Sequence, residues 1–161
     1  MKKGFTLIEL MVVLAISTIL LSMTMLGLNS IQQSSYEQSS LEILLSDIKL
    51  QQLKSMTGDT SIDTDHEPYG IYFGTDSYTL FRGVSYNPAE VTNFTVSLQG
   101  PLSFASVTIP SSSLIFEKGS GQFIDYVAGQ NNFSLVNSVT GQIITVTINE
   151  YGVINDINYA Q

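Results

Sequence analysis

The chain has 161 residues, about the size of one domain, with fourteen acidic and six basic side chains and a formal net charge of −8. This balance argues against a nucleic-acid-binding protein, because neutralising phosphates requires clustered Lys and Arg. The absence of cysteine excludes a disulfide framework, a thiolate nucleophile and a Cys-based zinc site, and a single histidine, His66, excludes a site built on several imidazoles.

Residues 5–28 form a continuous run of apolar or small side chains interrupted by one acid, Glu9. A bilayer core of about 30 Å needs roughly 20 such residues in a helix, so the run predicts a membrane-spanning segment. Lys2 and Lys3 precede it and the next basic residue is Lys49, which predicts a cytoplasmic N-terminus and export of everything after residue 28. A secretory signal peptide fits less well, because the run is too long and no small-residue cleavage site follows it.

Glu9 requires an explanation of its own. A charged side chain at bilayer depth costs about 2.5–3.5 kcal/mol, and such residues are usually functional. No basic side chain occurs in the same apolar run, so a cationic partner has to come from another chain. The alternative is that Glu9 reaches back to the cytoplasmic headgroups.

The segment Lys2-Lys3-Gly4-Phe5-Thr6-Leu7-Ile8-Glu9-Leu10 resembles the N-terminal signature of type IV pilins and pseudopilins. The resemblance implies that residues 1–4 are a leader removed by prepilin peptidase after Gly4, and that the new terminus, Phe5, is N-methylated. It also implies a filament in which the Phe5 amine meets Glu9 of a neighbouring subunit. The implied partners are other pilin subunits, an inner-membrane platform, a cytoplasmic ATPase and, before assembly, membrane lipid.

Residues 1–67 contain no proline, and helix formers dominate up to residue 56. This composition predicts one helix over residues 5–57, with residues 29–57 as an amphipathic continuation. Gly27 lies near several weak helix formers and indicates either local melting or close helix packing. Gly58 supplies a stop signal. The apolar stripe expected to dock on the following domain contains Leu41, Leu44, Leu45 and Ile48, with Leu53 and Met56 extending it; Ser46, Asp47, Lys49 and Gln51 are expected on the other face.

Short alternating runs replace the helical periodicity over residues 58–161 and predict a small antiparallel β-domain. The overall expectation is an α+β fold, with a long N-terminal helix packed on this domain. The expected strands are 69–73 and 78–81, paired as a hairpin, then 94–98, 104–109, 114–116, 123–127, 142–149 and 153–154.

Segments 45–48, 69–73, 115–119 and 144–154 are similar to H-type pseudopilins of type II secretion and to related minor pilins. This likeness implies a low-abundance subunit near the filament tip, placed in the periplasm or at the cell surface. The rival hypothesis, from a different class, is a monomeric membrane-anchored extracytoplasmic binding domain that keeps its leader.

The remaining candidate sites are weak. An acidic loop resembles a cation site in composition, but its spacing does not match an EF-hand and a solvated linker explains it better; its carboxylates are Asp59, Asp63, Asp65 and Glu67. His66 in that charged loop supports no catalytic triad, so we expect no enzyme and no cofactor. Four aromatic residues of the first hairpin are expected to divide between core and a binding patch: Tyr69, Tyr72, Tyr78 and Phe81.

Overall fold

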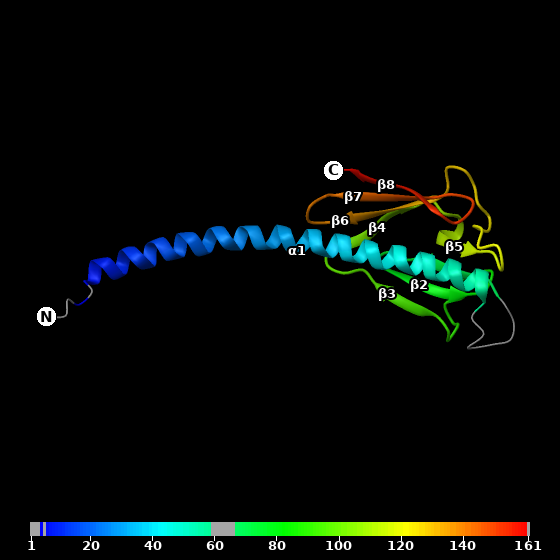
Figure 1. The fold of residues 1–161 in the computed structure, drawn as a ribbon, viewed down its shortest axis with the longest axis horizontal. Coiled ribbons are helices and arrows are strands. Elements are labelled where there is room, and N and C mark those ends of the chain that lie inside the picture. Colours follow the sequence, from blue (N-terminus) through cyan, green and yellow to red (C-terminus); the bar gives the residue numbers. More distant parts are fainter. Residues whose placement is uncertain (1–3, 5, 59–66, 161) are drawn as a thin grey trace. The chain divides into compact units, whose positions relative to one another are not determined.

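The structure is a computed structural model that describes residue 4 and residues 6–58 and 67–160, with the backbone but not the side chains of residues 24–34. The chain forms two compact units, Met1–Tyr36 and Glu37–Gln161, and helix α1 (Leu7–Thr57) contributes to both. The described strands are β1 (Tyr69–Phe73), β2 (Ser77–Arg82), β3 (Phe94–Ser97), β4 (Leu102–Val107), β5 (Ser113–Phe116), β6 (Asn132–Asn137), β7 (Ile143–Ile148) and β8 (Ile154–Ala160), with a short 3₁₀ helix η1 (Pro110–Ser112) before β5 (Figure 1).

The boundaries of α1 agree with the helix signals in the sequence. The helix ends at Thr57, and Gly58 has a positive φ of 76° while its N–H donates to the Lys54 carbonyl at 2.8 Å. This is the left-handed glycine cap that commonly ends a helix. The backbone is helical throughout residues 24–34 in the single chain, and local melting near Gly27 in a filament stays a prediction.

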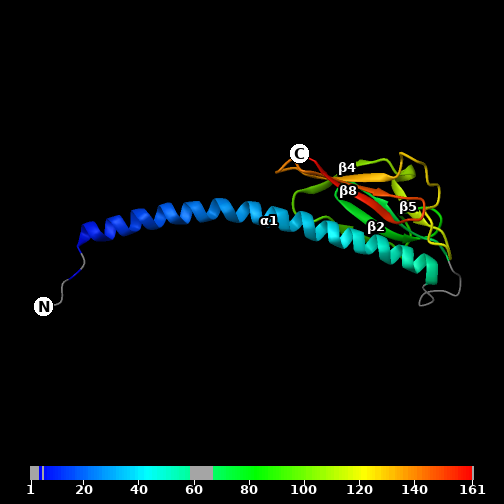
Figure 2. The same cartoon turned by 45° about the horizontal axis from the view of Figure 1, so that its top comes forward.

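The strands form two four-stranded antiparallel sheets, β3-β2-β1-β5 and β4-β6-β7-β8. Their apolar side chains meet in one core, where the Phe73 ring of the first sheet lies 4.8 Å from the Phe133 ring of the second. The second part of α1, from Glu37 onward, contacts both sheets and runs alongside them in both views (Figure 1 and Figure 2). The expected α+β class is therefore confirmed.

The docking face of α1 begins as predicted and then becomes polar. Leu41, Leu44 and Ile48 are buried in the core. The next positions at helical spacing are Gln51 and Ser55, which are also buried, so the expectation of Gln51 on the open face is wrong.

The two apolar residues expected to extend the stripe, Leu53 and Met56, are 54% and 48% exposed and do not belong to the core. The prediction included Leu53 and Met56 because they are apolar. The helical repeat of 3.6 residues instead places polar side chains on the face that packs against the domain. Those side chains hold β1: Gln51 Nε2 donates to the Gly70 carbonyl at 2.8 Å, and Ser55 Oγ accepts from the Tyr69 N–H at 2.9 Å.

Two strand predictions are corrected. Residues 123–127 form no strand: Phe123 makes an isolated bridge to Phe116, and Asp125 turns the chain with a φ of 58°. Strand β6 was not predicted, and the asparagine at each of its ends is a residue typical of turns. Its Phe133 and Leu135 are nonetheless fully buried, and they place β6 at the centre of the second sheet.

Candidate assembly site

The start of α1 is a capping box, a reciprocal pair of hydrogen bonds that satisfies the free N–H groups of the first turn. Glu9 Oε2 accepts hydrogen bonds from the backbone N–H of Thr6 at 3.0 Å and from the Thr6 hydroxyl at 2.8 Å. The Glu9 N–H is 3.3 Å from Thr6 Oγ1, to which it donates. The capping role of Thr6 was not predicted, although Thr-x-x-Glu before an apolar run is the sequence signal for a capping box.

The capping box places the predicted processing residues relative to the helix. Gly4 is exposed and precedes the capped turn, and Phe5 lies outside the described residues. Glu9 is exposed on the first turn of α1. In the sequence it lies a few residues after the bond between Gly4 and Phe5. Among the described residues, two groups donate hydrogen bonds to Glu9 Oε2 and no group donates a hydrogen bond to Oε1.

The helix that follows is apolar around its whole circumference. From Leu7 to Met23, the large apolar side chains are between 52% and 77% exposed. Because 3.6 residues complete a turn, consecutive exposed residues such as those from Leu10 to Leu14 cover every side of the helix.

Two hydroxyl groups within this stretch are satisfied by the helix itself. Thr18 Oγ1 donates to the Ala15 carbonyl at 2.9 Å, and Ser22 Oγ donates to the Ile19 carbonyl at 2.8 Å. Such back-bonding lets Ser and Thr lie on an apolar helix surface without a partner from solvent. This stretch therefore presents a surface that favours an apolar environment.

The expected membrane-spanning segment, residues 5–28, is not confirmed. Over the described residues, no helix combines the length and the apolar character that crossing a membrane requires.

The acidic loop gains no support as a metal site. Asp59, Asp63, Asp65 and His66 lie outside the described residues. Glu67 forms an ion pair with Arg82, with Oε2 and Nε 3.1 Å apart. Among the residues the structure describes, no group of three or more His, Cys, Asp and Glu side chains could hold a metal ion.

The aromatic residues of the first hairpin differ in how deeply they are buried. Tyr69, Tyr78 and Phe81 are buried, whereas Tyr72 is only partly buried and lines a cavity. Tyr78 donates its hydroxyl to Asp47 Oδ2 at 2.6 Å. Burial raises the pKa of Tyr78 above the ordinary value of 10.0, and the hydrogen bond to Asp47 raises it further.

Comparison with known proteins gives one match, confined to the N-terminal segment. No curated protein and no solved structure matches the chain. Residues 1–25 match the family model of the prokaryotic N-terminal methylation motif, the signature of type IV pilins and pseudopilins, and this motif implies a type IV pilin-like protein processed by prepilin peptidase.

Proposed function

We propose that this chain is a structural subunit of a type IV pilus-like or type II secretion-like filament, assembled through its N-terminal helix. The observation that carries the proposal is the capped start of α1, where Glu9 lies one turn from the processing bond on a helix that is apolar on all sides. The subunit is non-catalytic and needs no cofactor.

Cleavage between Gly4 and Phe5 is compatible with the capping box. Both residues precede Thr6, so removing residues 1–4 leaves the hydrogen bonds between Thr6 and Glu9 in place. The new amine of Phe5 has an ordinary pKa of about 7.7–8.0 and is largely cationic at neutral pH. N-methylation of an amine retains that charge.

The capping geometry also leaves room for a partner from a second subunit. A carboxylate accepts hydrogen bonds at both of its oxygens, and Thr6 uses only Oε2. The ammonium group of a neighbouring Phe5 can then pair with Oε1 while the cap remains intact. A subunit stacked in the wrong register would bury an ammonium and a carboxylate without their partners, which is strongly unfavourable in an apolar core.

We place the subunit in the cytoplasmic membrane before assembly, with the N-terminus inside and the β-domain exported. Lipid first covers the apolar surface between Leu7 and Met23, and neighbouring helices cover it in the filament. A minor position near the filament tip is proposed from the H-type likeness of four short segments. The acidic charge of the chain disfavours direct binding of nucleic acid by this subunit.

The first test is mass spectrometry of the protein purified from cells that express a prepilin peptidase. We expect loss of residues 1–4 and one added methyl group on Phe5. Recovery of the protein with its leader intact would instead support the rival, a monomeric membrane-anchored binding domain.

The second test separates the charge of Glu9 from its capping role. Glutamine also completes a capping box, so Glu9→Gln keeps the helix start while removing the charge. We expect Glu9→Gln to enter the membrane normally and to be lost from filaments. Glu42→Gln, a change at an exposed position of the same helix, is the matched control and should assemble normally. Incorporation of Glu9→Gln at the control level would contradict the pairing of Glu9 with a neighbouring amine.

A further inference from the structure

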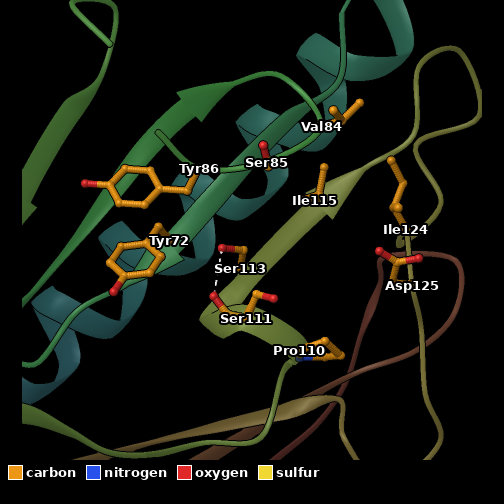
Figure 3. Close-up of a pocket in the computed structure, with 10 residues that line it drawn as sticks. All are labelled: Tyr72, Val84, Ser85, Tyr86, Pro110, Ser111, Ser113, Ile115, Ile124 and Asp125. Atoms are coloured by element: carbon orange, nitrogen blue, oxygen red, sulfur yellow. Dashed lines mark hydrogen bonds between the residues drawn. The ribbon is translucent and has the colours of Figure 1, made fainter. Parts of the chain in front are cut away.

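A hollow of the β-domain lies on the outer face of the first sheet. It is a cavity of about 460 Å³ formed by β1, β5 and the loops beside them (Figure 3). Tyr72 of β1 and Ser113 of β5 are paired in register and share this face, whereas their neighbours Ile71 and Leu114 point into the core. The cavity is therefore separate from the core, and it lies in the β-domain rather than in the N-terminal unit.

One end of the cavity is a flat aromatic surface. The rings of Tyr72 and Tyr86 are stacked, with centroids 4.1 Å apart and planes 9° apart. Tyr86 is also supported by the ring of Phe81, at 5.6 Å between centroids. Stacked rings held in this way present a rigid apolar face with hydroxyl groups at its rim.

Polar groups lie at other points around the cavity. Figure 3 shows the Asp125 carboxylate on the far side of the cavity from the two tyrosines, and the Ser85 hydroxyl at its upper edge. Among the described residues, no group donates a hydrogen bond to the Asp125 carboxylate. Ser113 Oγ donates to the Ser111 carbonyl at 3.1 Å, which leaves the lone pairs of that hydroxyl free to accept.

The backbone around this cavity adopts an unusual conformation. Among the described residues, the non-glycine positions with positive φ are Ser111, Ser112 and Asp125, at 54°, 51° and 58°. Ser111 and Asp125 line the cavity and Ser112 lies between two lining residues. Left-handed backbone at non-glycine residues costs energy and is concentrated at functional sites.

We propose that this cavity binds a neutral saccharide unit. Among the residues that the structure describes, no Lys, Arg or His lines it, which disfavours phosphate and carboxylate ligands. A single carboxylate in the same lining is too few for a hard divalent cation. The apolar face of a sugar ring fits against stacked tyrosines, and sugar hydroxyls can donate to Asp125 and to Ser113. The volume lies in the range of about 300–1,000 Å³ that is usual for small-molecule sites.

The binding test uses the full-length protein in micelles of a zwitterionic detergent that carries no sugar headgroup. Isoleucine and valine methyl groups labelled with ¹³C serve as reporters, with Val84, Ile115 and Ile124 in the cavity and Ile144 and Val146 in the core. Glucose, galactose, mannose and N-acetylglucosamine are titrated separately. We expect at least one of them to produce saturable shifts at the cavity methyl groups alone.

The proposal is overturned if no sugar of this panel shifts those methyl groups, or if the core methyl groups shift equally. It is also overturned if lysine amide, a cationic probe, saturates the cavity methyl groups while the sugars do not. The measurement needs no filament, so its outcome is independent of the assembly proposal.

Two matched pairs of variants assign the binding groups. Asp125→Asn tolerates the same left-handed backbone but loses the charge, and we expect it to weaken sugar binding about tenfold or more. Asp156→Asn, on β8, should leave binding unchanged. Tyr86→Ala should abolish the shifts, whereas Tyr159→Ala, at an exposed position of β8, should not. Unchanged affinity in both Asp125→Asn and Tyr86→Ala would overturn the assignment.

Asp125→Gly separates a binding role from a structural one. Glycine adopts a φ of 58° without strain, so the unfolding midpoint of this variant should be equal to or higher than that of the unmodified protein. Sugar binding should fall at the same time. A variant that loses both stability and binding would show that Asp125 serves the fold and would overturn its assignment as a ligand-binding group.

Discussion

Replacing Tyr78 by phenylalanine removes one hydroxyl from the core and leaves the ring in place. Tyr78 is 1% exposed, and its hydroxyl donates to Asp47 Oδ2 at 2.6 Å. Hydrogen bonds to charged groups contribute about 1.5–3 kcal/mol, and the partly exposed Asp47 can regain a water molecule in the variant. We therefore expect Tyr78→Phe to lower the free energy of unfolding by about 1–2 kcal/mol at pH 8.

The same substitution should change how stability depends on alkaline pH. The pKa of Tyr78 is raised above 10.0 in the folded state, so the folded protein keeps this proton at a pH where the unfolded chain loses it. The contribution of the Tyr78 hydroxyl to the free energy of unfolding is complete below pH 10. Above pH 10 it falls by up to about 1.4 kcal/mol for each further pH unit. Tyr78→Phe lacks this loss, so the difference between the two proteins should nearly disappear by about pH 11.

Urea unfolding of the full-length protein in micelles, followed by circular dichroism at pH 8, 10 and 11, measures both effects. Tyr159→Phe is the control, because Tyr159 is 59% exposed and its replacement should change stability by less than about 0.5 kcal/mol. A stability difference between Tyr78→Phe and the unmodified protein that is as large at pH 11 as at pH 8 would refute the reasoning.

Two further substitutions test the packing of the domain. An added Cβ at Gly152 would lie 2.7 Å from Phe116 Cε1 and 2.8 Å from the Gly121 carbonyl oxygen, so Gly152→Ala should destabilise by about 3 kcal/mol in urea unfolding. Gly141→Ala, with a similar φ of 74° and no atom within 4 Å, should lose only about 1 kcal/mol, and equal losses would contradict the steric argument. Gln51→Ala should cost about 1–3 kcal/mol because the hydrogen bonds from Nε2 to the carbonyls of Gly70 and Phe81 are lost, whereas the exposed Gln38→Ala should change stability by less than about 0.5 kcal/mol.

The fold was predictable wherever local periodicity and the buried face agree. Strand β7 alternates Ile144, Val146 and Ile148 with threonines, and those three side chains are buried. The opposite holds at the end of α1, where the buried positions are the polar Gln51 and Ser55. Hydrogen bonds from Gln51 and Ser55 to β1 determine which face of the helix end is buried. A hydrophobicity pattern cannot reveal such hydrogen bonds.

The two candidate sites differ in the same way. Gly4, Phe5 and Glu9 are close together in the sequence, so a local motif was enough to identify the N-terminal site. The cavity joins Tyr72, Tyr86, Ser113 and Asp125 from four separate segments. Tyr86 and Asp125 lie in irregular backbone, so their proximity to one cavity depends on loop conformations that the sequence pattern does not specify.

The order in which the chain visits the two sheets has a mechanical consequence. Strands β1, β2 and β3 build most of the first sheet, β4 enters the second, β5 returns to the first, and β6 to β8 complete the second. The chain therefore crosses between the two sheets three times, from β3 to β4, from β4 to β5 and from β5 to β6, and these three connections tie the layers together. A force that separates the two sheets loads all three connections together, so we expect the layers to part in one cooperative event.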